Sequence, residues 1–226
     1  MAEAGDEKNN RMSAIFPKGF DTRLRLAAGT VLVGAGVLLG IVIYLTHPQQ
    51  VDTGYMPVQP VAYSHKLHAG NLGLDCMYCH YTVDKSRFAA VPPAEVCMNC
   101  HARVREKSPQ LQLVRESYAT GKPIPWVQVH RLPDYVYFNH EAHVTAGVSC
   151  VHCHGRVDQM VEVRQVQPMS MAFCLECHRN PAAKIRPVQY VTNLGWKPEG
   201  DPAELGRKLI AAKHINPPQN CSGCHR

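Results

Sequence analysis

No cysteine in this 226-residue chain lies outside a repeated motif. All ten cysteines belong to five copies of Cys-x-x-Cys-His, so none remains for a disulfide framework or a lone reactive thiol. Paired Cys-x-x-Cys units also occur in zinc sites, but zinc assigns no role to the histidine that follows each pair. The lack of spare cysteines therefore argues against both a disulfide scaffold and a zinc ribbon.

Basic clusters interleaved with aromatic residues are also missing. The formal net charge is +6, and aromatic residues make up 7% of the chain. A positive balance alone suits nucleic acid or an anionic membrane surface. Without such clusters, we expect no nucleic-acid partner.

The five motifs have the form of covalent attachment sites for haem c. Two cysteines three residues apart lie on one face of a helical turn, so both thiols reach the vinyl groups of one porphyrin, and the next histidine lies under its iron. The sequence thus predicts five haem c groups. We number the motifs 1 to 5 along the chain: residues 76–80, 97–101, 150–154, 174–178 and 221–225. The predicted haem-attaching residues are Cys76, Cys79, Cys97, Cys100, Cys150, Cys153, Cys174, Cys177, Cys221 and Cys224, and the predicted proximal iron ligands are His80, His101, His154, His178 and His225.

This haem content sets the expected fold. From residue 48 onward the chain has about one haem for every 36 residues. Such a chain is too short to enclose five separate apolar cores, so the porphyrins must form the core, and the 17 prolines and 16 glycines agree with little regular structure. We expect a multihaem cytochrome c fold, mostly irregular with a few short α-helices around a haem core. Helices are predicted near residues 109–121 and 202–213, with loops elsewhere in this part of the chain.

The N-terminal region predicts a membrane anchor. Residues 1–25 are polar and rich in Lys and Arg, whereas residues 26–45 carry no charge and are long enough to cross a bilayer once. The basic residues precede the span, and positive charge favours the cytoplasmic side. We therefore expect a single-pass protein of the bacterial cytoplasmic membrane, with the N-terminus in the cytoplasm and the haem domain in the periplasm. A cleaved signal peptide is the alternative, but residues 46–61 contain no alanine for a cleavage site. We expect a tail at 1–25, a transmembrane helix at 26–46 and a linker at 47–62.

The remaining chain contains an internal repeat. His65 and His140 are 75 residues apart, and the first cysteines of motifs 1 and 3 are separated by 74 residues. Motifs 2 and 4 have a similar separation, so we interpret the chain as a duplicated two-haem unit. The predicted units are residues 63–134 and 135–187, followed by a C-terminal segment, 188–226, with the fifth haem.

Two His-x-x-His pairs precede motifs 1 and 3. His65, His68, His140 and His143 are therefore the best candidates for distal iron ligands. A haem with two histidine ligands has no open position for a substrate, so it only transfers electrons. His130 is ambiguous, because it could bind an iron or donate a hydrogen bond to a haem propionate.

The chain resembles two groups of cytochromes. The His-x-x-His and Cys-x-x-Cys-His arrangement is similar to small class III multihaem cytochromes. Several strings resemble the pentahaem subunit of alternative complex III, as do the single anchor and five motifs. These strings are residues 63–70 (Tyr-Ser-His-Lys-Leu-His-Ala-Gly), 96–101 (Val-Cys-Met-Asn-Cys-His), 129–140 (Val-His-Arg-Leu-Pro-Asp-Tyr-Val-Tyr-Phe-Asn-His) and 174–179 (Cys-Leu-Glu-Cys-His-Arg).

This resemblance implies an electron-relay subunit, not itself catalytic, in a membrane complex that oxidises quinol and reduces a periplasmic acceptor. The implied partners are an iron–sulfur subunit, multi-span quinol-binding subunits and a mono-haem cytochrome. In class III cytochromes, a residue just before one motif binds the haem of a later motif. Met171 holds a similar place before motif 4, where the first unit has Ala94. The resemblance therefore implies Met171 as distal ligand of the fifth haem, with His130 as the rival and ordinary packing as the third interpretation.

Two other functions stay open from the sequence. A multihaem reductase of nitrite or hydroxylamine needs one open iron, and the number of candidate distal ligands argues against it. An anchored quinol dehydrogenase acting alone needs a quinol pocket near the membrane. Residues 46–61 offer no obvious acid–base pair for such a pocket.

Overall fold

The computed structural model describes residues 16–51 and 53–225. The chain divides into two units, Met1–His47 and Pro48–Arg226. In the first, helix α1 (Phe20–Thr46) has 27 residues, and none of its side chains is buried. Such a helix is about 40 Å long at about 1.5 Å per residue, which exceeds the hydrocarbon thickness of a bilayer. By length and composition it is a candidate membrane span.

Helix α1 begins before the uncharged stretch predicted to cross the membrane. Gly19 precedes it in a left-handed conformation, with φ at 88°, which glycine adopts without strain. The first two turns carry an exposed ion pair between Arg25 and Asp21, at 2.8 Å. The helix therefore consists of a short charged turn followed by the apolar segment.

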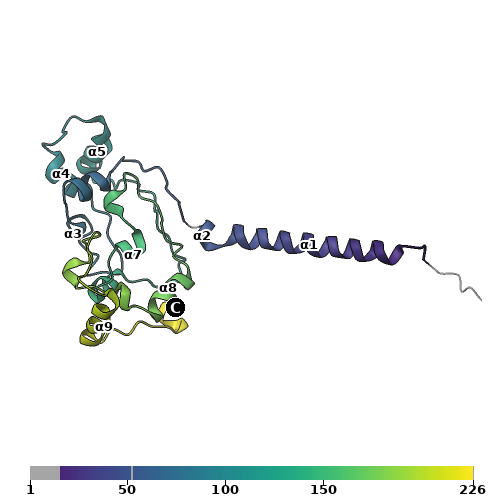
Figure 1. Ribbon diagram of the computed structural model, residues 1–226. Helices are drawn as coiled ribbons and strands as arrows, with labels where there is room; N and C mark the ends of the chain where they lie inside the picture. The colour runs from purple at the N-terminus through teal and green to yellow at the C-terminus, as the bar shows by residue number, and fades with distance from the viewer. Residues whose placement is uncertain (1–15, 52, 226) are drawn as a thin grey trace, which may run out of the picture. The chain divides into compact units, whose positions relative to one another are not determined.

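The second unit consists of short helices joined by long irregular segments (Figure 1). Among the described residues there is no β-strand, only two isolated bridges, Val136 with His225 and Val148 with Ile185. This confirms the expected fold of short helices and irregular chain. The helices are α2 (Pro48–Val51), η1 (Lys66–Asn71), α3 (Cys76–Cys79), α4 (Ala94–His101), η2 (Pro109–Leu111), α5 (Gln112–Thr120), α6 (His140–Ala146), α7 (Val151–His154), η3 (Val157–Gln159), α8 (Met171–Arg179), η4 (Ala182–Lys184), η5 (Val188–Tyr190), α9 (Pro202–Lys213) and α10 (Cys221–Cys224).

Both helices predicted from local signals are present. Helix α5 ends at Gly121, which has a φ of 71° and donates its N–H to the Ser117 carbonyl. Helix α9 begins at the predicted cap, where the Asp201 carboxylate accepts the N–H of Ala203 at 3.0 Å.

The prediction of loops elsewhere was wrong at several places. Helices α4, α6 and α8 have 8, 7 and 9 residues, and each contains a haem motif or a His-x-x-His pair. The helical turn required by a motif extends outward where a flanking residue supports it. Before α8, for example, the Ser170 hydroxyl accepts the N–H of Phe173 at 3.3 Å.

The apolar core of the second unit is small and is built around the motifs. One buried cluster contains Val61, Ala94, Val114 and Ile124, and Cys97 and Met98 of motif 2 pack against it. The other contains Val83, Val144 and Val191, with Met77 of motif 1 and Cys150 of motif 3 against it. The core clusters thus position motifs 1, 2 and 3.

Candidate haem-binding site

All ten cysteine thiols are unpaired in the structure. In motifs 1, 3 and 5 the histidine N–H donates to the carbonyl of the first cysteine, at 2.8 Å each time. Motifs 2 and 4 lie within the longer helices α4 and α8. Every motif therefore forms a helical turn, which places its two thiols on one face.

Three of the five predicted proximal histidines share a hydrogen-bonding pattern. The Nδ1 atoms of His80, His101 and His178 lie 2.6, 2.9 and 2.6 Å from the carbonyl oxygens of Ala90, Val104 and Pro218. Because a carbonyl oxygen only accepts, Nδ1 must carry the hydrogen. In a neutral ring this leaves Nε2 unprotonated, which is the form that binds a metal.

The predicted distal histidines follow the same rule at three positions. Nδ1 of His68, His140 and His143 donates to the carbonyls of Ser64, Arg87 and Asn139, at 2.9, 2.9 and 2.7 Å. His65 differs, because its buried Nδ1 has no hydrogen-bond partner among the described residues. Three of these four imidazoles therefore present a free Nε2 in a defined direction.

Histidine rings from different segments lie near each other in three pairs, which we call facing pairs below. The ring centroids are 6.2 Å apart for His68 and His101, 6.1 Å for His143 and His178, and 6.4 Å for His140 and His154. Two imidazoles on opposite sides of one metal ion, with metal–nitrogen bonds of about 2 Å, place their centroids about 6 Å apart. These pairs have the spacing required of two axial ligands.

Burial lowers the pKa of four histidines of this site. It lowers the pKa of His65 to about 4 and that of His154 to about 3, in both cases with smaller contributions from nearby histidines. The pKa values of His140 and His143 are lowered for the same main reason. Neutral imidazole is the state that coordinates iron, so burial favours ligation near neutral pH.

Within the described part of the chain, His65 forms no ring pair of this kind with a proximal histidine. His80 is nevertheless close enough to contribute, after burial, to the lowered pKa of His65. The structure therefore brings the first histidine of the repeat into the neighbourhood of motif 1.

The two rival ligands of the fifth haem lie in different surroundings. The His130 Nε2 is 3.3 Å from Nδ1 of His154, and the rings are 4.3 Å apart, too close to lie across one iron. Met171 begins helix α8 and is 67% exposed. The ring neighbour of His225 among the described residues is Tyr135, at 5.7 Å. Neither rival thus faces His225 in the manner of the three histidine pairs.

Two aromatic residues hold the distal histidines, a role that the sequence interpretation missed. The Tyr63 ring stacks on His68 at 4.4 Å and meets His65 edge-on at 4.8 Å. Phe138 repeats this arrangement with His143 and His140, at 4.5 and 4.7 Å. The signal in the sequence was the aromatic residue two positions before each His-x-x-His pair.

The donor set suits haem better than a bare metal ion. Over residues 16–51 and 53–225, no group of three or more His, Cys, Asp or Glu side chains is arranged to hold a metal ion. The porphyrin supplies four nitrogens, so a haem iron needs only the facing pairs observed. Unpaired thiols beside each proximal histidine complete the requirements for haem c. The residues present therefore fit this cofactor.

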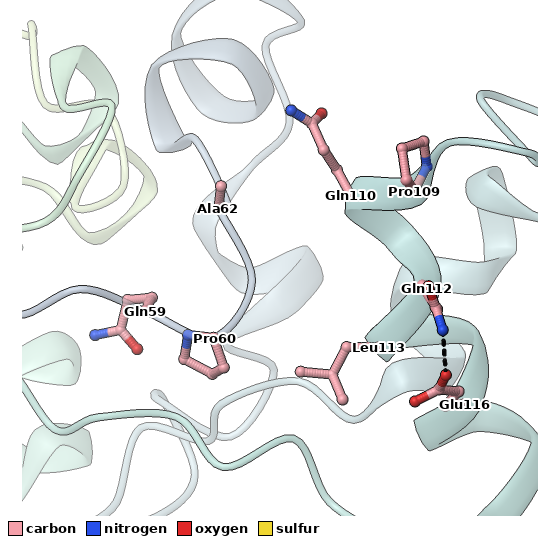
Figure 2. Close-up of a pocket in the computed structure, with 8 residues that line it drawn as sticks. All are labelled: Gln59, Pro60, Ala62, Pro109, Gln110, Gln112, Leu113 and Glu116. Carbon is pink, nitrogen blue, oxygen red and sulfur yellow. Dashed lines mark hydrogen bonds between the residues drawn. The ribbon is translucent and has the colours of Figure 1, made fainter.

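A hollow on the second unit lies apart from these residues. Figure 2 shows it between the segment around Gln59 and Pro60 and helix α5. Its lining has no histidine or cysteine, and its carboxylate, Glu116, accepts a hydrogen bond from Gln112 at 2.8 Å. This hollow contributes nothing to the haem-binding residues.

Comparisons with known proteins agree with this chemistry. Residues 136–226 match the family described as cytochrome c7 and related cytochrome c. The chain is also 35% identical over 97 residues to the multihaem cytochrome c subunit of menaquinone reductase from Nitratidesulfovibrio vulgaris strain Hildenborough. That match covers 42% of this chain and 45% of the relative. Residues 136–226 are therefore similar in sequence to cytochrome c7 and related cytochromes c, and the chain spans less than half of the relative's length.

Proposed function

We propose that this chain binds five covalent haem c groups and relays electrons within a membrane quinol oxidoreductase of the alternative complex III type. Bound haem supplies reversible one-electron chemistry at its iron. The chain's own residues attach the cofactor through paired thiols and hold each imidazole in the required tautomer. The observation that carries the proposal is the set of facing histidine pairs beside the motifs.

The ring geometry supports three of the five ligand pairs, and the lowered pKa of His65 beside His80 supports a fourth. We assign the His65/His80 pair to haem 1, His68/His101 to haem 2, His140/His154 to haem 3 and His143/His178 to haem 4. For haem 5 we assign His225 and Met171, on the position of Met171 before motif 4. These pairs would give each haem iron two protein ligands, which would leave no position for a substrate and would separate this function from reduction of nitrite or hydroxylamine.

The anchor and the relative support a membrane complex. Helix α1 is preceded by basic residues, so we place the N-terminus in the cytoplasm and the second unit in the periplasm. The matched relative is named as a subunit of a menaquinone reductase. The expected partners are an iron–sulfur subunit, multi-span quinol-binding subunits and a mono-haem cytochrome.

The relative's name favours a second candidate function. A menaquinone reductase passes electrons toward quinone, which is the reverse of quinol oxidation. The same haem relay serves either direction, because its residues fix haem positions and leave the driving force to the partners. Direction is decided by which couple, the quinone or the periplasmic protein, has the lower potential.

Purification of the native complex in mild detergent tests both candidates. We expect multi-span membrane subunits to co-purify, and quinol to reduce the haems in the alternative complex III case. Reduction of quinone by an added periplasmic cytochrome would support the second candidate instead. A chain that purifies alone and oxidises quinol at a rate comparable with a complex would contradict the relay function.

A further inference from the structure

Side chains at the centre of motifs 1 and 2 are joined directly. The Asn99 amide of motif 2 donates a hydrogen bond to the Tyr78 hydroxyl of motif 1, at 3.0 Å. The helical turn η1 lies close to both motifs, because His68 pairs with His101 and His65 is a neighbour of His80. Motifs 1 and 2 are therefore adjacent in space.

Motif 1 is also held against motif 3, although their first cysteines are 74 positions apart in the sequence. The Cys76 thiol donates a hydrogen bond to the Thr192 carbonyl at 3.7 Å, and the Asp75 carboxylate accepts one from the Thr192 hydroxyl at 2.7 Å. Ser149, which precedes motif 3, is 1% exposed and donates its hydroxyl hydrogen to the Val191 carbonyl at 2.6 Å. Two consecutive residues, Val191 and Thr192, thus bond to Ser149 beside motif 3 and to the start of motif 1. The buried cluster around Val191 adds apolar contact between them.

Helix α6 links motif 3 to motif 4. Its His140 faces His154 of motif 3 at 6.4 Å, and its His143 faces His178 of motif 4 at 6.1 Å. Residues three apart on a helix lie about 5–6 Å from each other at Cβ. One helical turn therefore carries a partner for each of these two motifs and sets them side by side.

Motif 4 is connected in turn to motif 5. The segment that enters motif 5 accepts the His178 Nδ1–H at the Pro218 carbonyl, 2.6 Å away. The next residue, Gln219, donates its amide to the His178 carbonyl at 3.5 Å. Motif 5 is thus anchored on the proximal histidine of motif 4.

The exposure of the cysteines identifies two motifs that differ from the rest. Cys100 of motif 2 and Cys221 of motif 5 are exposed, whereas the other eight cysteines are half-buried. In the contacts described above, motifs 2 and 5 each contact only one other motif. The interior motifs, 1, 3 and 4, have a neighbour on each side.

We infer that the haems form one unbranched chain in the order 2–1–3–4–5, so that electrons are taken up and delivered at haems 2 and 5. This inference rests on the proposed function, since it requires all five haems to be attached. Electrons cross between the two halves of the internal repeat at haems 1 and 3. The order along the relay therefore differs from the order in the sequence.

Cryo-electron microscopy of the native, haem-loaded complex tests the order through iron–iron distances. The four shortest distances should join haems 2 and 1, 1 and 3, 3 and 4, and 4 and 5. A shortest path in sequence order, or a haem with three near neighbours, would overturn the inference. Fewer than five haems in the density would instead contradict the proposed function, so the two failures are distinguishable.

A matched pair of variants tests the order in solution. His68 and His143 hold equivalent places in the repeat, and we assign them to haems 2 and 4. In the full complex, His68→Met and His143→Met should each raise one haem potential, because a thioether favours ferrous iron. An EPR-monitored redox titration should show one further haem perturbed by the first variant and two by the second. Two perturbed neighbours for His68→Met, or one for His143→Met, would contradict the order.

Discussion

Six imidazoles donate Nδ1–H to main-chain carbonyls, and this arrangement is the main device by which single residues prepare the site. A carbonyl fixed by a turn or helix defines both the tautomer and the ring direction. The cysteine and histidine residues were predictable from their spacing alone. Their acceptors were not, because residues such as Ala90 and Pro218 contribute only backbone atoms, and any residue type offers those.

Removal of one distal imidazole should open one iron. We predict that His143→Ala leaves haem 4 five-coordinate and high-spin, since no second imidazole faces His178 among the described residues. The reduced variant should bind carbon monoxide at one haem, measured by absorption spectroscopy. His214→Asn is the control, because His214 is an exposed helix cap with φ at 52°, which asparagine tolerates. Carbon monoxide binding to the unaltered chain would contradict filled axial positions.

The assignment of Met171 gives a spectroscopic prediction. Met171→His should lower the potential of one haem and abolish the near-infrared band of methionine-ligated ferric haem, because imidazole is the harder donor. Redox titration and near-infrared magnetic circular dichroism measure the two effects. If the unaltered chain has no such band, Met171 is not a ligand.

His152 should make the free energy of unfolding depend on pH. Burial, then the charges of Arg186 and Lys184, lower its pKa from 6.5 to about 4. The folded chain resists protonation that the unfolded chain accepts, so this contribution is complete above about pH 6.5 and is lost as pH falls toward 4. We predict that His152→Asn reduces the loss of stability between pH 7 and pH 5, as measured by urea denaturation. An unchanged loss would show that His152 does not titrate in this way.

At the scale of elements, three short helices each contain a haem motif or a His-x-x-His pair and continue beyond it. Helices α5 and α9 carry caps and glycine or proline signals, so they were predictable. Helices α4, α6 and α8 were not, because their sequences are interrupted by the motif residues and show little apolar periodicity. Packing around the motifs, such as Ala94 within the first core cluster, determines them.

Helix α9 depends on one close contact. A Cβ added at Gly206 would overlap the backbone carbonyl of Ala182 in η4. Alanine improves helix propensity by about 1 kcal/mol, but forcing a side chain into a packed contact costs about 1–3 kcal/mol and backbone here has little room to move. We predict that Gly206→Ala lowers the denaturation midpoint followed by circular dichroism.

The same helix provides the control for that change. Ala211 is exposed, so Ala211→Gly should cost only the propensity difference, about 1 kcal/mol. A Gly206→Ala variant more stable than the unaltered chain would show that α9 and η4 separate easily.

At the scale of the whole molecule, the internal repeat explains much of the second unit. The Tyr63 ring stacks on His68 in the same way as the Phe138 ring stacks on His143. The duplicated spacing in the sequence predicts this match. The contact between motifs 1 and 3 was not predictable from the sequence. It depends on residues 191 and 192, which lie more than 110 positions from motif 1. Contacts at such separation leave no local pattern in the sequence.

The central claim is that all five motifs carry covalent haem c. Intact-protein mass spectrometry of the denatured chain tests it most directly, because thioether bonds survive denaturation whereas coordinated metals do not. We predict a mass above that of the polypeptide by five haems. A smaller number of haems, or a mass lowered by disulfide formation among the ten cysteines, would contradict it.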